Sequence, residues 1–169
     1  MLEIKNEGIV LEPRDLPFEA EGVLNPACAE KDGVVHMFYR AVAKGNYSTV
    51  GHCVVRGNQV SDRSPLPIMV SEYQYESHGI EDPRITLIDG TYYMLYTAYD
   101  GNNAVVAYAT SRDLINFGKK GVITPQISYD EAEDMWILKR FIADITETVF
   151  ICGKKMRHYS LKRLMVNMR

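Results

Sequence analysis

Apolar runs separated by turn residues predict short antiparallel strands along most of the chain. Asp-Gly pairs at 32–33 and 89–90 each separate two apolar runs, and this dipeptide tolerates the positive φ of a tight hairpin turn. The runs that follow, residues 34–42 and 92–99, are rich in aromatic and β-branched side chains that suit a pleated surface. Because both runs are almost continuously apolar, we expect burial on both of their faces.

The whole pattern occurs twice at a constant interval in the sequence. Asn25-Pro26-Ala27 precedes Asp82-Pro83-Arg84 by this interval (82 − 25 = 57), and so do the two Asp-Gly turns and the runs that begin at Met37 and Met94. We expect a third strand in each copy near residues 49–55 and 104–110, and a fourth near 59–61 and 122–124. Val50–Cys53 is aligned with Val105–Tyr108, a drift that a loop allows.

The repeat predicts one domain over residues 1–169, with copies at about 22–78 and 79–135 and a degenerate third copy at 136–169. In the third copy Thr148–Cys152 follows Thr91–Leu95 at the same interval. Four antiparallel strands per repeat describe a propeller blade, so we predict an all-β partial propeller of two to three blades. Four copies of this length would exceed the 169 residues present, so we expect no closed ring from one chain.

Composition restricts the function classes. Hydrophobic residues make up 46% and charged residues 24%, which is typical of a globular protein. Residues 1–138 carry 11 Lys and Arg against 20 Asp and Glu (11 − 20 = −9), an acidic body that argues against nucleic-acid binding. No apolar run is long enough to span a membrane, and the start does not resemble a signal peptide, so we expect a cytoplasmic protein. The three cysteines suggest neither a disulfide framework nor a zinc site, and we expect no bound cofactor.

The main candidate for chemistry is the segment Gly79–Arg84, which combines Glu81, Asp82 and Arg84 where a strand should begin. Strand alternation places Asp82 and Arg84 on one face and Glu81 on the other. An arginine there could hold a carboxylate or orient a sugar hydroxyl, whereas the simpler alternative is a surface ion pair. The equivalent position in the first copy is Asn25, and polar residues at matching positions can converge on a propeller axis.

Arg40 is the second candidate, because it interrupts an apolar strand whose other copy has Thr97 at that position. A guanidinium without a partner is costly to bury, so Arg40 either reaches solvent or pairs with an anion in a polar central pocket. The sequence leaves both alternatives open.

Several motifs resemble glycoside hydrolase family 130, the β-mannoside phosphorylases and related mannosidases. They are Glu21–Ala27, Phe38–Ala41, Gly79–Arg84 and Ser111–Phe117, within a resemblance that covers about residues 18–134. It implies a five-bladed β-propeller with its active site at one end of the central channel, of which this chain resembles the N-terminal half.

The resemblance also implies the chemistry and the substrates, a β-mannoside oligosaccharide and inorganic phosphate as co-substrate. Asp82 would be the general acid, acting through a sugar hydroxyl, while phosphate attacks the anomeric carbon and gives mannose 1-phosphate with inversion. Asn25, Arg40, Glu81 and Arg84 would bind the mannosyl unit or orient Asp82. Protonation of a leaving group needs a carboxyl that retains its proton, which a partly desolvated site favours. The family's phosphate-binding cations come largely from later blades, and Lys119 and Lys120 lie near the position of some of them.

Two other functions remain open at this point. One is a catalytically inactive half-propeller that binds carbohydrate or a protein partner. The other is a related glycosidase that acts on furanosides. Assembly of several copies through open blade edges would satisfy the exposed strands in either case.

Overall fold

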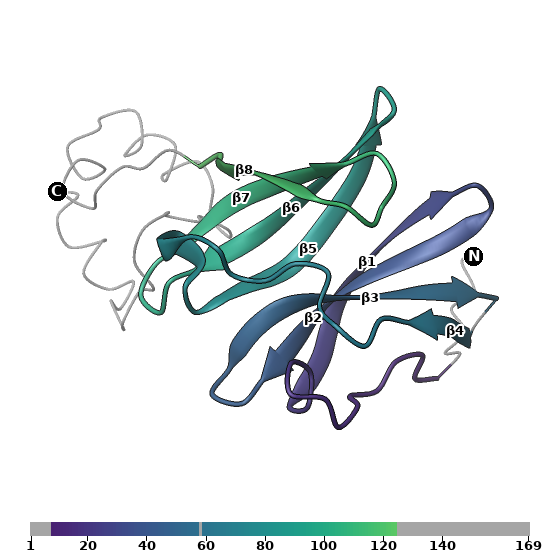
Figure 1. The fold of residues 1–169 in the computed structure, drawn as a ribbon, viewed down its shortest axis with the longest axis horizontal. Coiled ribbons are helices and arrows are strands. Elements are labelled where there is room, and N and C mark those ends of the chain that lie inside the picture. Colours follow the sequence, from purple (N-terminus) through teal and green to yellow (C-terminus); the bar gives the residue numbers. More distant parts are fainter. Residues whose placement is uncertain (1–7, 58, 125–169) are drawn as a thin grey trace, which may run out of the picture.

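The structure, a computed structural model, describes residues 8–57 and 59–124, and these residues form an all-β fold. Figure 1 shows the strands in two groups, purple to blue and teal to green. The strands are β1 (Gly22–Lys31), β2 (Val34–Ala43), β3 (Tyr47–Arg56), β4 (Gln59–Arg63), β5 (Gly79–Ile88), β6 (Thr91–Tyr99), β7 (Ala104–Ser111) and β8 (Gly118–Val122). The described residues include one short 3₁₀ turn, η1 (Gln74–Glu76), before β5. No helix among them is long and apolar enough to cross a membrane.

Each group is a four-stranded antiparallel sheet in which sequence neighbours pair, β1-β2-β3-β4 (blade 1) and β5-β6-β7-β8 (blade 2). A single parallel pair, Ser48 with Gly79, joins β3 to β5. The chain is therefore part of a β-propeller, as the sequence predicts. The third copy of the repeat, residues 136–169, lies outside the described residues.

The interval of the sequence repeat recurs in the backbone. Asp32 and Asp89 have φ values of 52° and 48° and form the two predicted hairpin turns with the glycines that follow them. A β-bulge interrupts β1 between Leu24 and Ala27, and an equivalent bulge interrupts β5 between Glu81 and Arg84. Equivalent turns and bulges give the two blades the same geometry at their inner strands.

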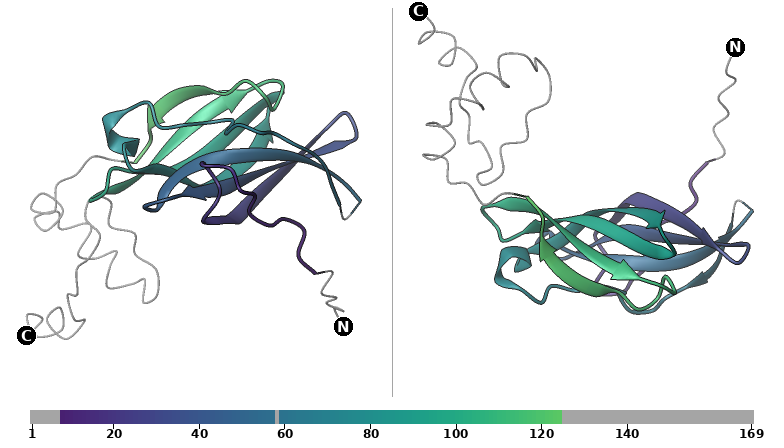
Figure 2. Two further views of the ribbon diagram at one scale, coloured as in Figure 1. Left: turned by 60° about the horizontal axis from the view of Figure 1, so that its bottom comes forward. Right: turned by 90° about the horizontal axis from the view of Figure 1, so that it is seen from above.

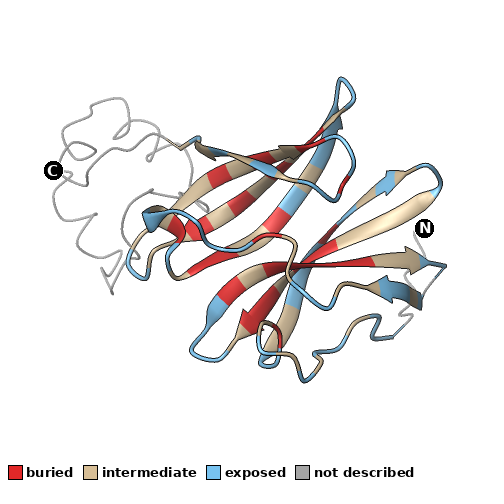
Figure 3. Cartoon of the chain, in the orientation of Figure 1, coloured by how far each residue is buried: buried red, intermediate tan, exposed pale blue. Residues whose placement is uncertain are grey.

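The main core lies between the two blades. Phe38 and Val50 of blade 1, both fully buried, belong to one cluster with Ile80, Met94 and other residues of blade 2. The segment from β4 to β5 runs along this junction in Figures 1 and 2 and contributes Met69. In Figure 3 buried positions gather on the middle strands, and the hairpin tips are exposed. Packing between blades therefore accounts for most of the described core.

The opposite face of blade 2 is less covered. Leu95, Val106 and Tyr108 occupy the places that Phe38, Val50 and His52 have in blade 1, yet each is only partly buried. On β6, buried and partly buried positions therefore alternate, so the expectation of complete burial on both faces was wrong for this strand. One face of β6 lies in the core between the blades, and the other lacks a covering layer among the described residues.

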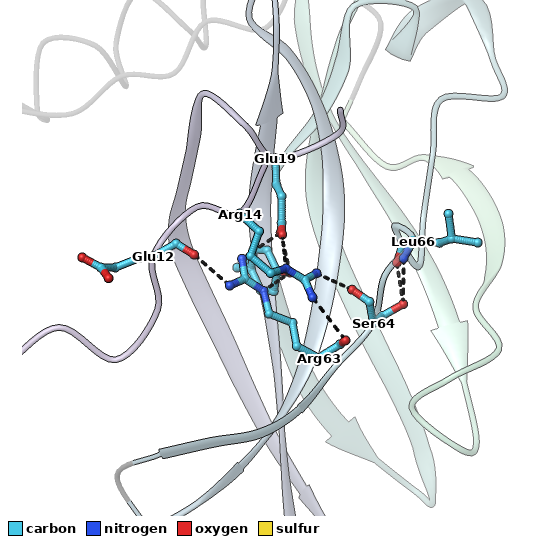
Figure 4. Close-up of polar contacts among 7 residues, drawn as sticks. Glu12, Arg14, Glu19, Arg63, Ser64 and Leu66 are labelled. Atoms are coloured by element: carbon cyan, nitrogen blue, oxygen red, sulfur yellow. Dashed lines mark hydrogen bonds and ion pairs between the residues drawn. The ribbon is translucent and has the colours of Figure 1, made fainter. Parts of the chain in front are cut away.

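A fully buried glutamate, Glu19, ties the N-terminal segment to blade 1. Its carboxylate accepts hydrogen bonds from Tyr39 Oη at 2.8 Å, Arg63 Nη2 at 2.8 Å and Arg14 Nε at 2.5 Å. Arg14 also donates to the carbonyl oxygen of Ser64, and Figure 4 shows both guanidinium groups at the carboxylate. Burial raises the pKa of Tyr39 to about 12, so its hydroxyl keeps the proton that it donates.

Blade 2 repeats this arrangement around Glu76, at the interval of the sequence repeat (76 − 19 = 57). The Glu76 carboxylate, also fully buried, accepts hydrogen bonds from Tyr96 Oη at 3.1 Å and from Lys119 Nζ. It also accepts the backbone N–H groups of Glu72 and Tyr73 at 2.8 and 3.2 Å. In both blades a residue from the preceding segment is thus bonded to the second strand and to the outermost strand. We call these groups the Glu19 network and the Glu76 network.

The predicted fourth strands have different outcomes. β4 begins at Gln59, where the sequence predicts it, whereas β8 spans Gly118–Val122 and ends at Val122, where the sequence predicts its start. The alignment of Val50 with Val105 is also wrong by one position. Arg40 pairs with Val50, and its equivalent Thr97 pairs with Val106. The interval between the copies is therefore shorter by one position from the third strand onwards.

Candidate active site

Two polar side chains from equivalent inner strands meet at one end of the two blades. Asn25 of β1 donates from Nδ2 to Oδ1 of Asp82 of β5 at 2.7 Å. Both residues precede a proline and lie in the bulges, with φ values of 49° and 51°. Asn and Asp tolerate this left-handed conformation better than most residues, so the sequence supports the geometry that brings them together.

Arg40 of β2 contacts the two adjacent carboxylates of β5, Glu81 and Asp82. Its Nη2 donates to Glu81 Oε1 at 2.7 Å, and its Nη1 lies 3.8 Å from Asp82 Oδ1. Nε donates to Ser48 Oγ at 2.9 Å, and Nη2 is 3.4 Å from Asn46 Oδ1. Of the two alternatives for Arg40, the structure supports pairing with anions, since only 14% of its side chain is exposed.

The three charged residues have different exposures. The side chain of Glu81 is 17% exposed, whereas that of Asp82 is 36% exposed. Glu81 is therefore the closer and less exposed carboxylate partner of Arg40, and Asp82 remains accessible from solvent. This leaves one carboxylate to position the guanidinium and another that a ligand can reach.

The predicted alternation across Glu81, Asp82 and Arg84 is wrong. The bulge breaks the period of two, so Glu81 and Asp82 both contact Arg40. Arg84 is exposed, and its Nη1 donates to the carbonyl oxygen of Pro83 at 2.7 Å. The structure therefore brings Asn25, Arg40, Glu81 and Asp82 together and leaves Arg84 outside this group. We call these four residues the Arg40 cluster.

Two further acids shape turns. Asp100 accepts the backbone N–H groups of Asn102 and Asn103, and Asp113 accepts those of Ile115 and Asn116. Hydrogen bonds from Asn116 and its neighbours lower the pKa of Asp113, and hydrogen bonds from Asn103 and Asn102 outweigh burial and lower that of Asp100. Asp100 thus caps the turn that Asn102 and Asn103 form, and Asp113 organises the Ser111–Phe117 motif.

Lys119 has a structural partner. Its side chain is only 4% exposed, and Nζ donates to Glu76 and to the Val70 carbonyl oxygen. This cation belongs to the Glu76 network, so it does not supply a free charge for an anion. Lys120 is exposed.

Sequence reasoning missed Ser48, Asn46, Glu19 and Glu76. Ser48 and Asn46 orient Arg40, and their signal was their place at the start of the strand that pairs with β2 and in the turn before it. The two glutamates lie outside the strands of the repeat. Their spacing, which equals the repeat interval, was nevertheless visible.

A carboxylate that solvent can reach, beside one held by a largely but not fully buried arginine, suits acid–base chemistry and hydrogen bonding to a hydroxyl-rich substrate. Together with the inner strands of a propeller, this is the arrangement expected of a carbohydrate-active β-propeller protein. The chain belongs to the glycoside hydrolase 130 family, described as β-1,4-mannooligosaccharide phosphorylase, whose model matches residues 6–164. This confirms the resemblance that the four motifs indicate.

Two relatives that match this chain are named as mannoside phosphorylases. A 1,2-β-oligomannan phosphorylase of Thermoanaerobacter sp. (strain X514) is 31% identical over 137 residues, which are 75% of this chain and 46% of that protein. A β-1,2-mannobiose phosphorylase of the same strain is 29% identical over 148 residues, covering 78% of this chain and 49% of that protein. The chain spans about half the length of these two relatives.

A solved structure agrees with the fold. It comes from work on GH130 glycoside hydrolases that target β-1,2 mannosidic linkages in Candida mannan, and it superimposes with a TM-score of 0.64 at 27% identity. The match covers 72% of this chain and 40% of the other. The family thus includes proteins named as phosphorylases and proteins named as hydrolases.

Proposed function

We propose that the Arg40 cluster binds the mannosyl unit of a β-mannoside and contributes the general acid of an inverting cleavage. The observation that carries this proposal is the hydrogen bond from Asn25 to Asp82. Arg40 lies 3.8 Å from the same carboxylate and donates a hydrogen bond to the neighbouring Glu81. Asp82 is the acid because it is the accessible carboxyl of the cluster and lies in the motif shared with the family. Arg40 and Asn25 fix its orientation, and Glu81 fixes Arg40.

In the proposed reaction inorganic phosphate attacks the anomeric carbon from the face opposite the leaving oxygen. The C–O bond to the leaving sugar breaks as the new C–O bond to phosphate forms. A proton passes from Asp82, by way of a sugar hydroxyl, to the leaving oxygen. The products are mannose 1-phosphate with inverted configuration and the shortened saccharide. The activity needs no further cofactor, and the proposed location is the cytoplasm, where phosphate is abundant.

The phosphorolysis is tested by incubating the protein with β-1,2- and β-1,4-linked mannobiose, with and without phosphate, and assaying mannose 1-phosphate. We expect phosphate-dependent product, with Asp82→Asn reducing the rate at least about 100-fold because general acid catalysis contributes about 10²–10⁴. Arg84→Gln is the matched control, since Arg84 lies outside the cluster. An Asp82→Asn variant as active as the parent would remove Asp82 from the mechanism.

The second candidate is a catalytically inactive half-propeller that binds carbohydrate or a protein partner. Its support is the face of blade 2 that is only partly buried among the described residues. It predicts saccharide binding that survives Asp82→Asn and no turnover with either phosphate or water.

For either candidate we propose that copies of this chain associate through the open side of blade 2. Leu95, Val106 and Tyr108 stand where blade 1 has residues packed against a neighbouring blade, so another blade would cover them in the same manner. Sedimentation equilibrium tests this proposal. A dimer or larger assembly that Leu95→Lys dissociates is expected, and a well-folded monomer contradicts it.

A further inference from the structure

Three aromatic rings at the Arg40 end of the blades form a group that the proposed chemistry does not use. They belong to Tyr47 at the start of β3, His78 just before β5, and Tyr99 at the end of β6. The Tyr47 and His78 ring centroids lie 4.4 Å apart with planes inclined by 34°, and His78 meets Tyr99 edge to face at 5.4 Å. We call these residues the aromatic platform.

The backbone fixes the platform beside the Arg40 cluster. Ser48 follows Tyr47, and its hydroxyl oxygen accepts a hydrogen bond from Arg40 Nε. The Ser48 backbone N–H donates to the His78 carbonyl oxygen at 3.4 Å. The His78 N–H donates to the Tyr99 carbonyl oxygen at 2.9 Å, and Tyr99 Oη donates to the Gly101 carbonyl oxygen at 2.7 Å. The rings are therefore attached to the same backbone segments that position Arg40 through Ser48.

Tyr47 nevertheless leaves much of its surface open. It is 51% exposed, although its ring already contacts the tilted ring of His78. In residues 8–57 and 59–124 neither the Tyr47 hydroxyl nor a His78 ring nitrogen makes a hydrogen bond within 3.5 Å, and none of these atoms is a buried unsatisfied group. An exposed apolar ring next to accessible donors and acceptors is suited to a ligand with an apolar face and a polar rim.

We infer that the aromatic platform binds a second sugar unit of a manno-oligosaccharide, next to the unit held by the Arg40 cluster. A β-mannosyl ring has one face of axial C–H bonds, which packs on Tyr47, and hydroxyl groups at its edge, which reach the His78 nitrogens. This inference rests on the proposed function and deepens it. The platform favours chains of two or more units over free mannose.

The inference is tested by calorimetric titration of the full chain with mannose, β-1,2-mannobiose and β-1,2-mannotriose. Parent protein is expected to bind the longer sugars at least about tenfold more tightly than mannose, the scale of one good aromatic contact. Tyr47→Ala abolishes this preference and leaves the affinity for mannose unchanged. Tyr47→Phe should retain the preference, because the ring rather than its hydroxyl makes the contact, and loss of the preference in this variant contradicts the inference.

Tyr73→Ala is the matched control, because Tyr73 is 45% exposed and stacks on Tyr75 but contacts Lys119 and not the Arg40 cluster. It should leave all three affinities unchanged. Equal affinity of the parent for mannose and mannobiose, or an equal loss for both sugars in Tyr47→Ala, overturns the inference while the proposed function stands. Failure of every sugar to bind the parent rejects the proposed function, and the platform with it.

Discussion

Replacing Glu76 with glutamine removes the negative charge at the centre of the Glu76 network. The carboxylate is fully buried, and Lys119, with 4% of its side chain exposed, loses its nearest counter-charge. The exposed Glu72 carboxylate, 3.8 Å from Nζ and 56% exposed, is too well solvated to replace it. Removal of one partner from a buried ion pair costs about 3–5 kcal/mol, because the remaining charge is desolvated without compensation.

That loss is a large part of the total stability expected for the chain. Small domains unfold with about 5–15 kcal/mol, so Glu76→Gln should reduce the urea midpoint by about a fifth or more. The assay is urea unfolding followed by circular dichroism. Glu72→Gln is the matched control, and since the Glu72 carboxylate is 56% exposed we expect a loss below about 1 kcal/mol.

A double-mutant cycle separates the ion pair from other effects. Lys119→Met removes the buried cation and leaves Glu76 with the Tyr96 hydroxyl and two backbone N–H groups. The variant with both Glu76→Gln and Lys119→Met should therefore lose less stability than the sum of the two single variants, by about 1–3 kcal/mol. Additive losses, or a Glu76→Gln loss below about 1 kcal/mol, would refute the argument.

Three other perturbations test the described residues. Gly51→Ala should destabilise blade 1 by about 1–3 kcal/mol in urea unfolding, since the new Cβ would overlap Cζ of the buried Tyr39 ring; unchanged stability would mean that the ring can move. Burial and the neighbouring His36 lower the pKa of His52 from 6.5 to about 4, so neutral His52 favours the fold. Stability is then complete above pH 6.5 and falls towards pH 4, a loss that His52→Gln should reduce, while an equal pH profile in both proteins would contradict it. Arg40→Lys should weaken mannose binding about tenfold or more, measured by calorimetry, because lysine cannot reproduce the forked contacts of the guanidinium; retained affinity would assign Arg40 a purely structural role.

Features that depend on local chemistry could be predicted from the sequence. The Asp-Gly turns and the polar residues before Pro26 and Pro83 both follow from residues that tolerate positive φ, and their repetition identified the blade. The meeting of Asn25 and Asp82 followed from the same repetition, because equivalent positions on adjacent blades face a common axis.

Features that depend on register could not be predicted in this way. The bulges that place Glu81 and Asp82 together on Arg40 add a residue that a strict alternation does not contain. Lys119 looked like a free cation near an anion site, since its partner Glu76 is distant in the sequence and outside any strand. The roles of the four cluster residues in binding and catalysis stay predictions.

The Glu19 and Glu76 networks show where one structural unit of this fold begins. Each glutamate precedes the first strand of its own blade. Nearby apolar residues are separated by the same interval as the sequence repeat, Leu11 from Ile68 and Phe18 from Tyr75, and all four pack against buried clusters. An ancestral duplication that copied only the four strands would have separated each buried cation from its carboxylate. A single blade that is excised or transplanted should therefore be cut in the connection between β4 and β5 near Ser64–Pro67. The segment that contains Glu76 then stays with blade 2, whose strands it binds.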